Sequence, residues 1–93
     1  MKVYLKIISP KFQNSLSNKF IIEHDTSQIP FMTLIHKLKS HNSDLYHEIS
    51  TDDTINSSYL CIVNNELILN DQKDSLYLND GDKVVISIAI GGG

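Results

Sequence analysis

The stretch LNDGDKVVISIAIGGG, residues 78–93, decides how the rest of this chain is interpreted. It contains Asp80-Gly81, a dipeptide that is typical of a tight turn. The apolar residues that follow alternate between two faces, which predicts a strand over 83–90. Three glycines then end the sequence. Because glycine has no Cβ, residues 91–93 are expected to form a thin, flexible tail that can enter a narrow channel of another protein.

The residues before this stretch predict a hairpin followed by a helix. Residues 2–9 alternate with a period of two, and residues 19–25 return as a second, antiparallel strand after a short polar turn. Pro30 suits the first turn of a helix, where its missing N–H is not needed. Apolar side chains then recur at helical spacing: Phe31, Leu34, Ile35 and Leu38.

The middle of the chain is less regular. Residues 45–49 carry a second, shorter helical pattern, and the small polar residues of 50–58 predict a loop of low order. Residues 59–64 predict a short apolar strand, central in the sheet and buried on both faces. Asn64-Asn65 predicts a tight turn into a short strand over 66–69, because asparagine tolerates the left-handed conformation.

This order of elements predicts an α+β fold, since the helices and strands are segregated along the chain. A helical crossover between the hairpin and the final strand makes the first and last strands parallel neighbours. We therefore expect one α+β domain over residues 1–90, and its order of elements resembles the ubiquitin-like β-grasp fold. Its mixed sheet of four to five strands would pack on one main helix, with the last strand central and the glycine tail leaving at the rim.

The composition excludes several classes of protein. The 93 residues are enough for one domain, with 11 acidic residues, 8 basic residues and a net charge of −3. All basic residues are lysines. Because the chain lacks arginine, the residue best suited to bidentate contacts with phosphates and bases, we do not expect it to bind nucleic acid. No apolar run approaches the roughly 20 residues of a membrane span, and the N-terminal residues lack the long apolar core of a signal peptide. A single cysteine, Cys61, cannot form an internal disulfide, which is typical of a cytoplasmic protein.

Several side chains with reactive groups have a more ordinary interpretation. Cys61 lies in an apolar strand and is expected to be a buried, inert thiol rather than a nucleophile. Asp80 and Asp82 flank a glycine but lack the rest of a calcium loop, so they are expected to form a turn. Four histidines without helical ligand spacing are expected on the surface, and no metal site is predicted: His24, His36, His41 and His47.

Two segments near the C-terminus resemble a known family. They are Ile62-Val63-Asn64-Asn65 and the L-x-D-G-D-x-V stretch at 78–84, which is followed by the terminal Gly92-Gly93. Together they are similar to the sulfur-carrier family that includes the small subunit of molybdopterin synthase (MoaD), the thiazole sulfur carrier (ThiS) and ubiquitin-like modifiers of related origin. The chain departs from the pattern at Gly91, where the family usually has a side chain, and in its long segment 42–58. It also has no arginine before the glycine pair.

The resemblance implies a carrier protein rather than an enzyme. A MoeB/ThiF-like adenylating enzyme would use ATP to activate the carboxylate of Gly93, with Gly91 and Gly92 recognised in its channel. The activated carboxylate would receive sulfur as a thiocarboxylate for a synthase subunit, as the small subunit of molybdopterin synthase does. Alternatively, it would be conjugated to lysines of target proteins. The carrier itself would bind no cofactor. A third interpretation is a β-grasp binding module with an incidental tail.

A carrier of this kind also needs a recognition surface. If the helix covers one face of the sheet, the other face is partly exposed. Depending on the strand register, an apolar patch is expected there from Val85, Ala89 and Ile90, with Tyr4 or Ile8 beside them. Exposed apolar patches mark interfaces. Because apolar surface is common on all proteins, it is equally expected that these residues are ordinary sheet residues without a role in binding.

Overall fold

The computed structural model describes residues 1–9, 19–52, 54–69, 72–73 and 75–88. In this part of the chain no helix is both long and apolar enough to cross a membrane.

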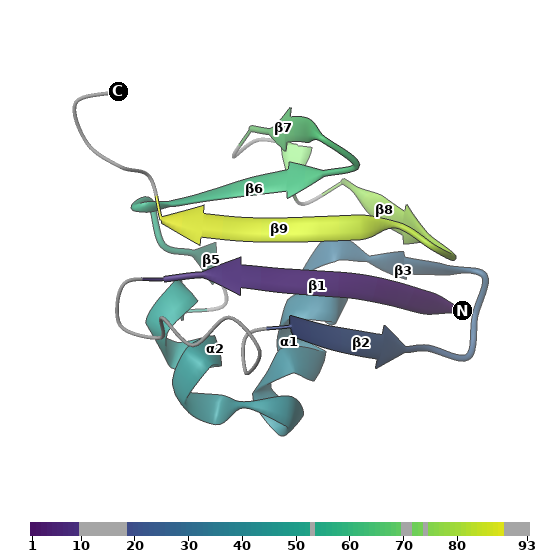
Figure 1. Ribbon diagram of the computed structural model, residues 1–93, viewed down its shortest axis with the longest axis horizontal. Coiled ribbons are helices and arrows are strands. Elements are labelled where there is room, and N and C mark those ends of the chain that lie inside the picture. The colour runs from purple at the N-terminus through teal and green to yellow at the C-terminus, as the bar shows by residue number, and fades with distance from the viewer. Residues whose placement is uncertain (10–18, 53, 70–71, 74, 89–93) are drawn as a thin grey trace.

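A mixed, five-stranded sheet forms the body of the molecule (Figure 1). Its strands lie in the order β2-β1-β9-β6-β7. β1 pairs antiparallel with β2 and parallel with β9, and β9 pairs antiparallel with β6. The predicted parallel pairing of the first and last strands is confirmed, and the last strand is central as expected. The strands are β1 Lys2–Ile8, β2 Lys19–Glu23, β6 Tyr59–Val63, β7 Glu66–Ile68 and β9 Lys83–Ile88.

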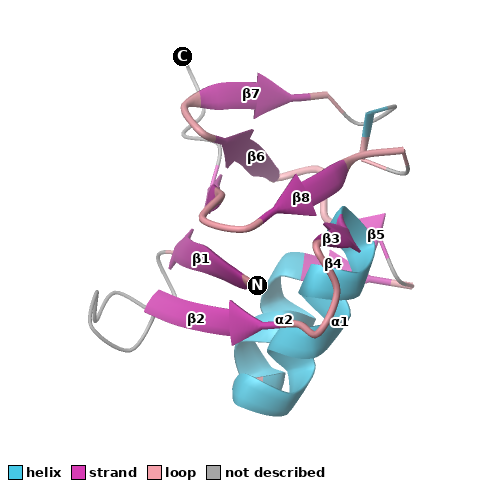
Figure 2. Ribbon diagram, turned by 90° about the vertical axis from the view of Figure 1, so that its right-hand side faces the viewer, coloured by secondary structure: helices cyan, strands magenta, loops and turns pink. Residues whose placement is uncertain are grey.

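Two helices, α1 Phe31–His41 and α2 Ser43–Ile49, pack against one face of this sheet (Figures 1 and 2). Both were predicted from their apolar periodicity. α1 starts directly after Pro30 without a side-chain cap, whereas Asn42 caps α2 by accepting a hydrogen bond from the backbone N–H of Leu45 at 3.0 Å. The four apolar residues that predicted α1 are fully buried, so this helix supplies one side of the core.

The sheet supplies the other side of the core through alternate residues. In β1 the side chains of Val3, Leu5 and Ile7 are buried, and the residues between them are exposed. Val84 and Ile86 continue this layer in β9. Such alternation is what a sheet with one covered face requires, because successive side chains point to opposite faces.

The interpretation of 59–64 as a central strand buried on both faces is wrong. β6 lies next to β7, one position from the edge of the sheet. Tyr59, Cys61 and Val63 are buried, but Leu60 is 41% exposed and Ile62 is half-buried. Both helices lie on the same side of the sheet, so among the described residues no layer covers the second face of β6 (Figure 2). An apolar run therefore forms a strand with only one buried face.

Segment 50–58 has more order in its described residues than its polar composition predicted. β4 Ser50–Thr51 and β5 Thr54–Ile55 pair antiparallel, and Ile55 is buried. Asn56 organises the segment with both ends of its amide. Its Nδ2 donates to the carbonyl of Glu48 at 2.8 Å, and its Oδ1 accepts from the hydroxyl of Thr51 at 2.6 Å.

A further short pair closes the domain beside the start of α1. β3 Gln28–Pro30 pairs antiparallel with β8 Tyr77–Asn79. The sequence pattern predicts neither strand, because three residues carry too little periodicity. Leu78 of β8 is fully buried, so this short pair contributes to the core.

Candidate functional site

The turn that begins β9 is held by several hydrogen bonds. Gly81 adopts φ +85°, a conformation that favours glycine. One carboxylate oxygen of Asp82 accepts from the backbone N–H of Asn79 at 2.7 Å. Asp80 accepts from the backbone N–H of Lys2 at 2.7 Å, and the Gly81 N–H donates to the Lys2 carbonyl at 2.8 Å. The turn therefore fastens the start of β9 to the start of β1, and these contacts agree with the interpretation of both aspartates as turn residues.

The Asn64-Asn65 turn packs against this first turn. Both asparagines have positive φ, 50° and 69°, as predicted. The Asn64 amide nitrogen donates to the other carboxylate oxygen of Asp82 at 3.0 Å, and its oxygen accepts from the Lys83 N–H at 3.0 Å. The backbone N–H of Asn64 donates to the Lys83 carbonyl at 2.8 Å. The two segments that carry the family resemblance are thus parts of one hydrogen-bonded unit.

The predicted reactive end lies outside the described residues. β9 is described to Ile88, and neither Ala89 and Ile90 nor the three tail residues Gly91, Gly92 and Gly93 are among the described positions. Their assigned roles stay predictions.

The sheet face away from the helices, called here the open face, carries the described part of the predicted apolar patch. Tyr4 and Ile8 are each 44% exposed, and Val85 is half-buried. Tyr4 and Ile8 alternate with buried residues of β1, and Lys6 between them lies opposite Val85 in the register. The structure therefore brings these three residues onto one face.

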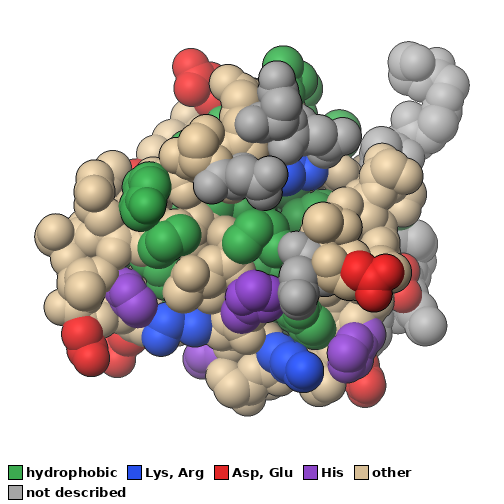
Figure 3. Space-filling model, turned by 180° about the vertical axis from the view of Figure 1, so that it is seen from behind, with side chains coloured by type: hydrophobic (Ala, Val, Ile, Leu, Met, Phe, Trp, Pro, Cys, Tyr) green, Lys and Arg blue, Asp and Glu red, His purple; other side chains and the backbone are tan. Residues whose placement is uncertain are grey.

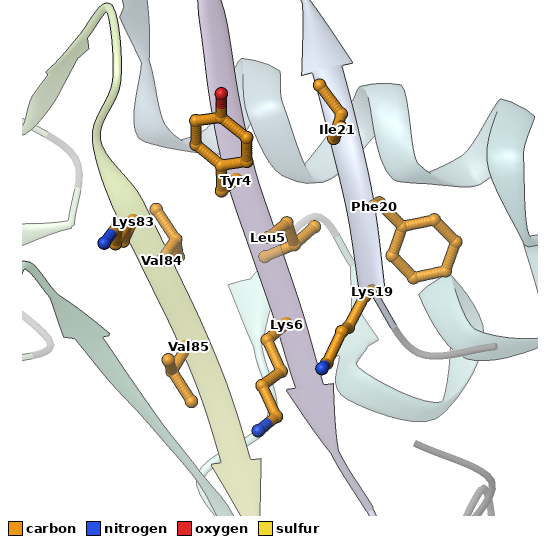
Figure 4. A pocket seen from close by; sticks show the side chains of 9 residues that line it. All are labelled: Tyr4, Leu5, Lys6, Lys19, Phe20, Ile21, Lys83, Val84 and Val85. Carbon is orange, nitrogen blue, oxygen red and sulfur yellow. The ribbon is translucent and has the colours of Figure 1, made fainter. Parts of the chain in front are cut away.

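Other residues of the open face were not singled out from the sequence. Ile21, Leu60 and Leu67 expose about half of their surface, between 41% and 55%. Strict alternation with buried neighbours in β2 and β6 is the signal that would have found Ile21 and Leu60. A depression of about 450 Å³ lies over β2, β1 and β9 (Figure 4). Its lining includes three lysines and apolar side chains: Tyr4, Leu5, Lys6, Lys19, Phe20, Ile21, Lys83, Val84 and Val85.

Cys61 is fully buried, as predicted. Burial raises the pKa of its thiol, and the charge of Lys73 lowers it in part. Lys73 is itself only 7% exposed, and nothing in the sequence indicated that it lies near the cysteine. The raised pKa keeps Cys61 as a neutral thiol at physiological pH, which does not favour a nucleophilic role.

A second polar contact in the core also escaped prediction. The hydroxyl of Tyr59 donates to the Glu48 carboxylate at 3.0 Å and lies 2.8 Å from the hydroxyl of Ser9. Burial raises the pKa of Tyr59, the Ser9 hydrogen bond lowers it, and Glu48 raises it. These contacts join β6, α2 and the end of β1, so their role is structural.

Histidine side chains are visible on the helical side of the molecule (Figure 3). The rings of His36 and His47 lie 6.3 and 5.2 Å from that of Tyr46, and His41 lies 6.0 Å from Phe20. Among the residues placed by the structure, no three His, Cys, Asp or Glu side chains gather as they would around a metal ion. The histidines of α1 and α2 therefore contact aromatic rings of the helical layer.

Comparison with known proteins identifies the fold. No family model and no curated protein matches the sequence. The structure is similar to SAMP1 from Haloferax volcanii, with a TM-score of 0.75, 14% identity and full coverage of both chains. It is also similar to the Haloferax volcanii HVO 2177 protein, with a TM-score of 0.70, 15% identity, and coverage of 100% of this chain and 87% of that one.

A third similar structure is that of CysO in the Amycolatopsis orientalis BexX/CysO complex. The TM-score is 0.70 and the identity 16%, and the match covers 98% of this chain and 99% of the other. Across these three structures the whole chain is matched at low identity, which is a likeness of fold. The chain therefore has the α+β, ubiquitin-like β-grasp fold that SAMP1 and CysO share.

Proposed function

We propose that this protein is a ubiquitin-like sulfur carrier whose C-terminal carboxylate, on Gly93, is adenylated and then converted to a thiocarboxylate. One observation carries the proposal: a ubiquitin-like fold coincides with the L-x-D-G-D-x-V segment and a terminal Gly92-Gly93. The hydrogen bonds of the Asp80–Asp82 turn support it, because they fasten the strand that leads toward the tail.

The proposed chemistry follows from the poor reactivity of a carboxylate. Its negative charge repels nucleophiles, and oxide is a poor leaving group. The Gly93 carboxylate attacks the α-phosphate of ATP, and pyrophosphate leaves. A sulfur nucleophile then attacks the carbonyl carbon of the acyl-adenylate and displaces AMP. A hydrosulfide equivalent gives the thiocarboxylate. The partner enzyme binds the ATP and lowers the barrier through positioning and charge stabilisation, so the carrier is a substrate.

The proposed partner is a MoeB/ThiF-like adenylating enzyme, followed by a synthase subunit that accepts the sulfur. Gly91 and Gly92 have no Cβ, which suits them to a narrow channel leading to the nucleotide. CysO, which shares this fold, has been solved in a complex with BexX, and this supports a protein partner for the present chain. We assign the docking surface to Tyr4, Ile8 and Val85 of the open face, together with Ala89 and Ile90, which follow β9 in the sequence.

Intact-mass spectrometry tests the proposal. The full chain is co-expressed with the MoeB/ThiF-like enzyme of its own organism and purified without reducing agent. The expected result is the mass change of one oxygen-to-sulfur exchange, located in the C-terminal peptide. The matched control is the chain without Gly92-Gly93, which should keep its unmodified mass. An unmodified C-terminal peptide, obtained with an enzyme that adenylates the chain, would count decisively against a sulfur carrier.

The second candidate is a protein modifier conjugated through Gly93 to lysines of target proteins. Gly91 and the long segment 42–58 keep this candidate open, because these departures from the family pattern do not point to one known pathway. In this case a thiol displaces AMP to give a thioester, which a lysine amine then attacks. Conjugates of high mass with an isopeptide bond at Gly93 are expected, and they should disappear when Gly92-Gly93 is deleted. Full biological function without the tail would instead indicate a binding module.

A further inference from the structure

The open face carries an excess of positive charge in a chain that is acidic as a whole. Its strand residues include four lysines and one glutamate, a net charge of +3, whereas the chain carries −3. Lys2 lies 4.0 Å from Glu23 in an exposed ion pair. Among the described residues, the ammonium groups of Lys6, Lys19 and Lys83 have no carboxylate within ion-pair distance. The positive charge is therefore concentrated where the sheet is uncovered.

Two of these lysines are placed against each other. In the register of β1 and β2, Lys6 lies directly opposite Lys19, and both are exposed. Figure 4 shows their side chains rising from neighbouring strands. Like charges at directly opposite positions destabilise a sheet, by an amount on the order of 0.2–1 kcal/mol. The fold gains nothing from this pair, so its presence indicates a role outside the folded monomer.

Apolar side chains lie beside these charges. Tyr4 is flanked by Ile21 on β2 and by Lys83 on β9, and Lys6 is flanked by Lys19 and Val85. Tyr4 and Ile21 are 44% and 55% exposed and line the depression over the three strands. A free anion would neutralise the lysines and leave these apolar groups in water. Only a larger surface covers both.

We propose that the open face binds an acidic protein surface, in which carboxylates oppose Lys6, Lys19 and Lys83 and an apolar side chain fills the depression beside Tyr4 and Ile21. The inference rests on the proposed function, since it states the surface chemistry of the adenylating partner. Complementary charge accelerates encounter and selects among partners, and the apolar contact supplies most of the affinity. Nucleic acid is a poor alternative, because the face has no arginine to read phosphate or base edges.

The test measures adenylation by ATP–pyrophosphate exchange. The purified MoeB/ThiF-like enzyme of the same organism is assayed with increasing concentrations of the full chain, wild type or Lys6→Glu. We expect KM to rise on the order of tenfold for Lys6→Glu while kcat stays the same, because docking weakens and the tail is unchanged. The wild-type KM should rise with salt concentration, and the variant's KM should depend on salt less steeply. Lys19→Glu should behave as Lys6→Glu does.

The matched control is Lys37→Glu, which makes the same change of charge on α1, on the covered side of the sheet. It should leave KM unchanged. Thermal unfolding separates docking from folding: Lys6→Glu turns a repulsive cross-strand pair into an attractive one, so its Tm should equal or exceed the wild-type value. A variant that is at least as stable but docks less well cannot be explained by a structural role of Lys6.

Different results overturn the docking surface and the proposed function. Exchange that proceeds with the same KM for wild type, Lys6→Glu and Lys37→Glu overturns this inference and leaves the proposed function standing. Equal increases of KM for Lys6→Glu and Lys37→Glu also overturn it, because KM would then depend on the net charge of the chain and not on the open face. Absence of both exchange and binding with the wild-type chain overturns the proposed function and this inference with it.

Discussion

Replacement of Asn64 by glycine tests whether the segment that carries the family resemblance is a folding element. Asn64 has positive φ and makes two side-chain hydrogen bonds, one to the Asp82 carboxylate and one from the Lys83 N–H, both at 3.0 Å. Glycine accepts the same backbone conformation without strain. The variant Asn64→Gly therefore removes the side-chain contacts and keeps the turn. Compared with the effect of Asn65→Gly at the neighbouring left-handed position, its effect on stability measures those contacts.

The magnitude follows from the two hydrogen bonds. Each contributes about 0.5–1.5 kcal/mol net, so their loss should lower the free energy of unfolding by about 1–3 kcal/mol. Glycine adopts the left-handed conformation more readily than asparagine, which offsets part of this loss and leaves a decrease of about 1–2 kcal/mol in the free energy of unfolding. In a domain of this size each kcal/mol corresponds to a decrease of about 4–8 °C in Tm.

The assay is urea unfolding followed by circular dichroism, with Asn65→Gly as the matched control. Asn65 also has positive φ, 69°, but no side-chain hydrogen bond of Asn65 is found in the described structure. Asn65→Gly should therefore be neutral or slightly stabilising. If the two variants change the free energy of unfolding equally, the two Asn64 side-chain bonds do not stabilise the start of β9. The family-like segment would then need a different explanation.

Two further predictions concern the buried polar groups. Tyr59→Phe should lose about 1–2 kcal/mol of stability at neutral pH, because it removes the hydroxyl that contacts Glu48 and Ser9. The pKa of Tyr59 is raised above its ordinary 10.0, so its contribution is complete below pH 10 and is lost as the pH rises through the folded-state pKa. Urea unfolding curves of the two proteins should thus converge in alkali, and a constant difference would contradict the assignment. Cys61 is fully buried with a raised pKa, so a thiol-specific disulfide reagent should modify the native protein much more slowly than the urea-unfolded chain. Equal rates would mean that the thiol is accessible in the folded state.

Much of the fold could be predicted because its signals are local. The alternation in 2–9, the helical spacing after Pro30 and the turn at Asp80-Gly81 each depend on neighbouring residues only. The handedness of crossovers then made β1 and β9 parallel neighbours, as the structure has them. These rules need no knowledge of the tertiary structure.

The position of β6 could not be predicted in the same way. YLCIV is apolar throughout, and such a run is compatible with burial on both faces or on one. The number of layers decides between them, and that depends on where both helices pack. Short strand pairs such as β3 with β8 could not be predicted for a related reason, since three residues carry too little periodicity to indicate a strand.

The candidate site likewise has some features that could be predicted from the sequence and others that could not. Tyr4, Ile8 and Val85 could be assigned to one face by alternation, given the right register. The opposition of Lys6 and Lys19 could not, because it depends on which residues of two strands lie side by side. The contact of Cys61 with Lys73 could likewise not be predicted, since a buried lysine is rare and the segment around Lys73 carries no regular pattern.

The sequence alone determined that this chain is one α+β domain of ubiquitin-like order, with a glycine tail following an apolar strand. Periodicity, turn residues and crossover handedness are properties of the chain itself, so they can be read without coordinates. Only the tertiary structure decided that the Asn64 and Asp82 turns form one unit, that no described layer covers the second face of β6, and that four lysines share the open face. Those features arise from register and layer packing, which join residues far apart in the chain and are not encoded in any short segment.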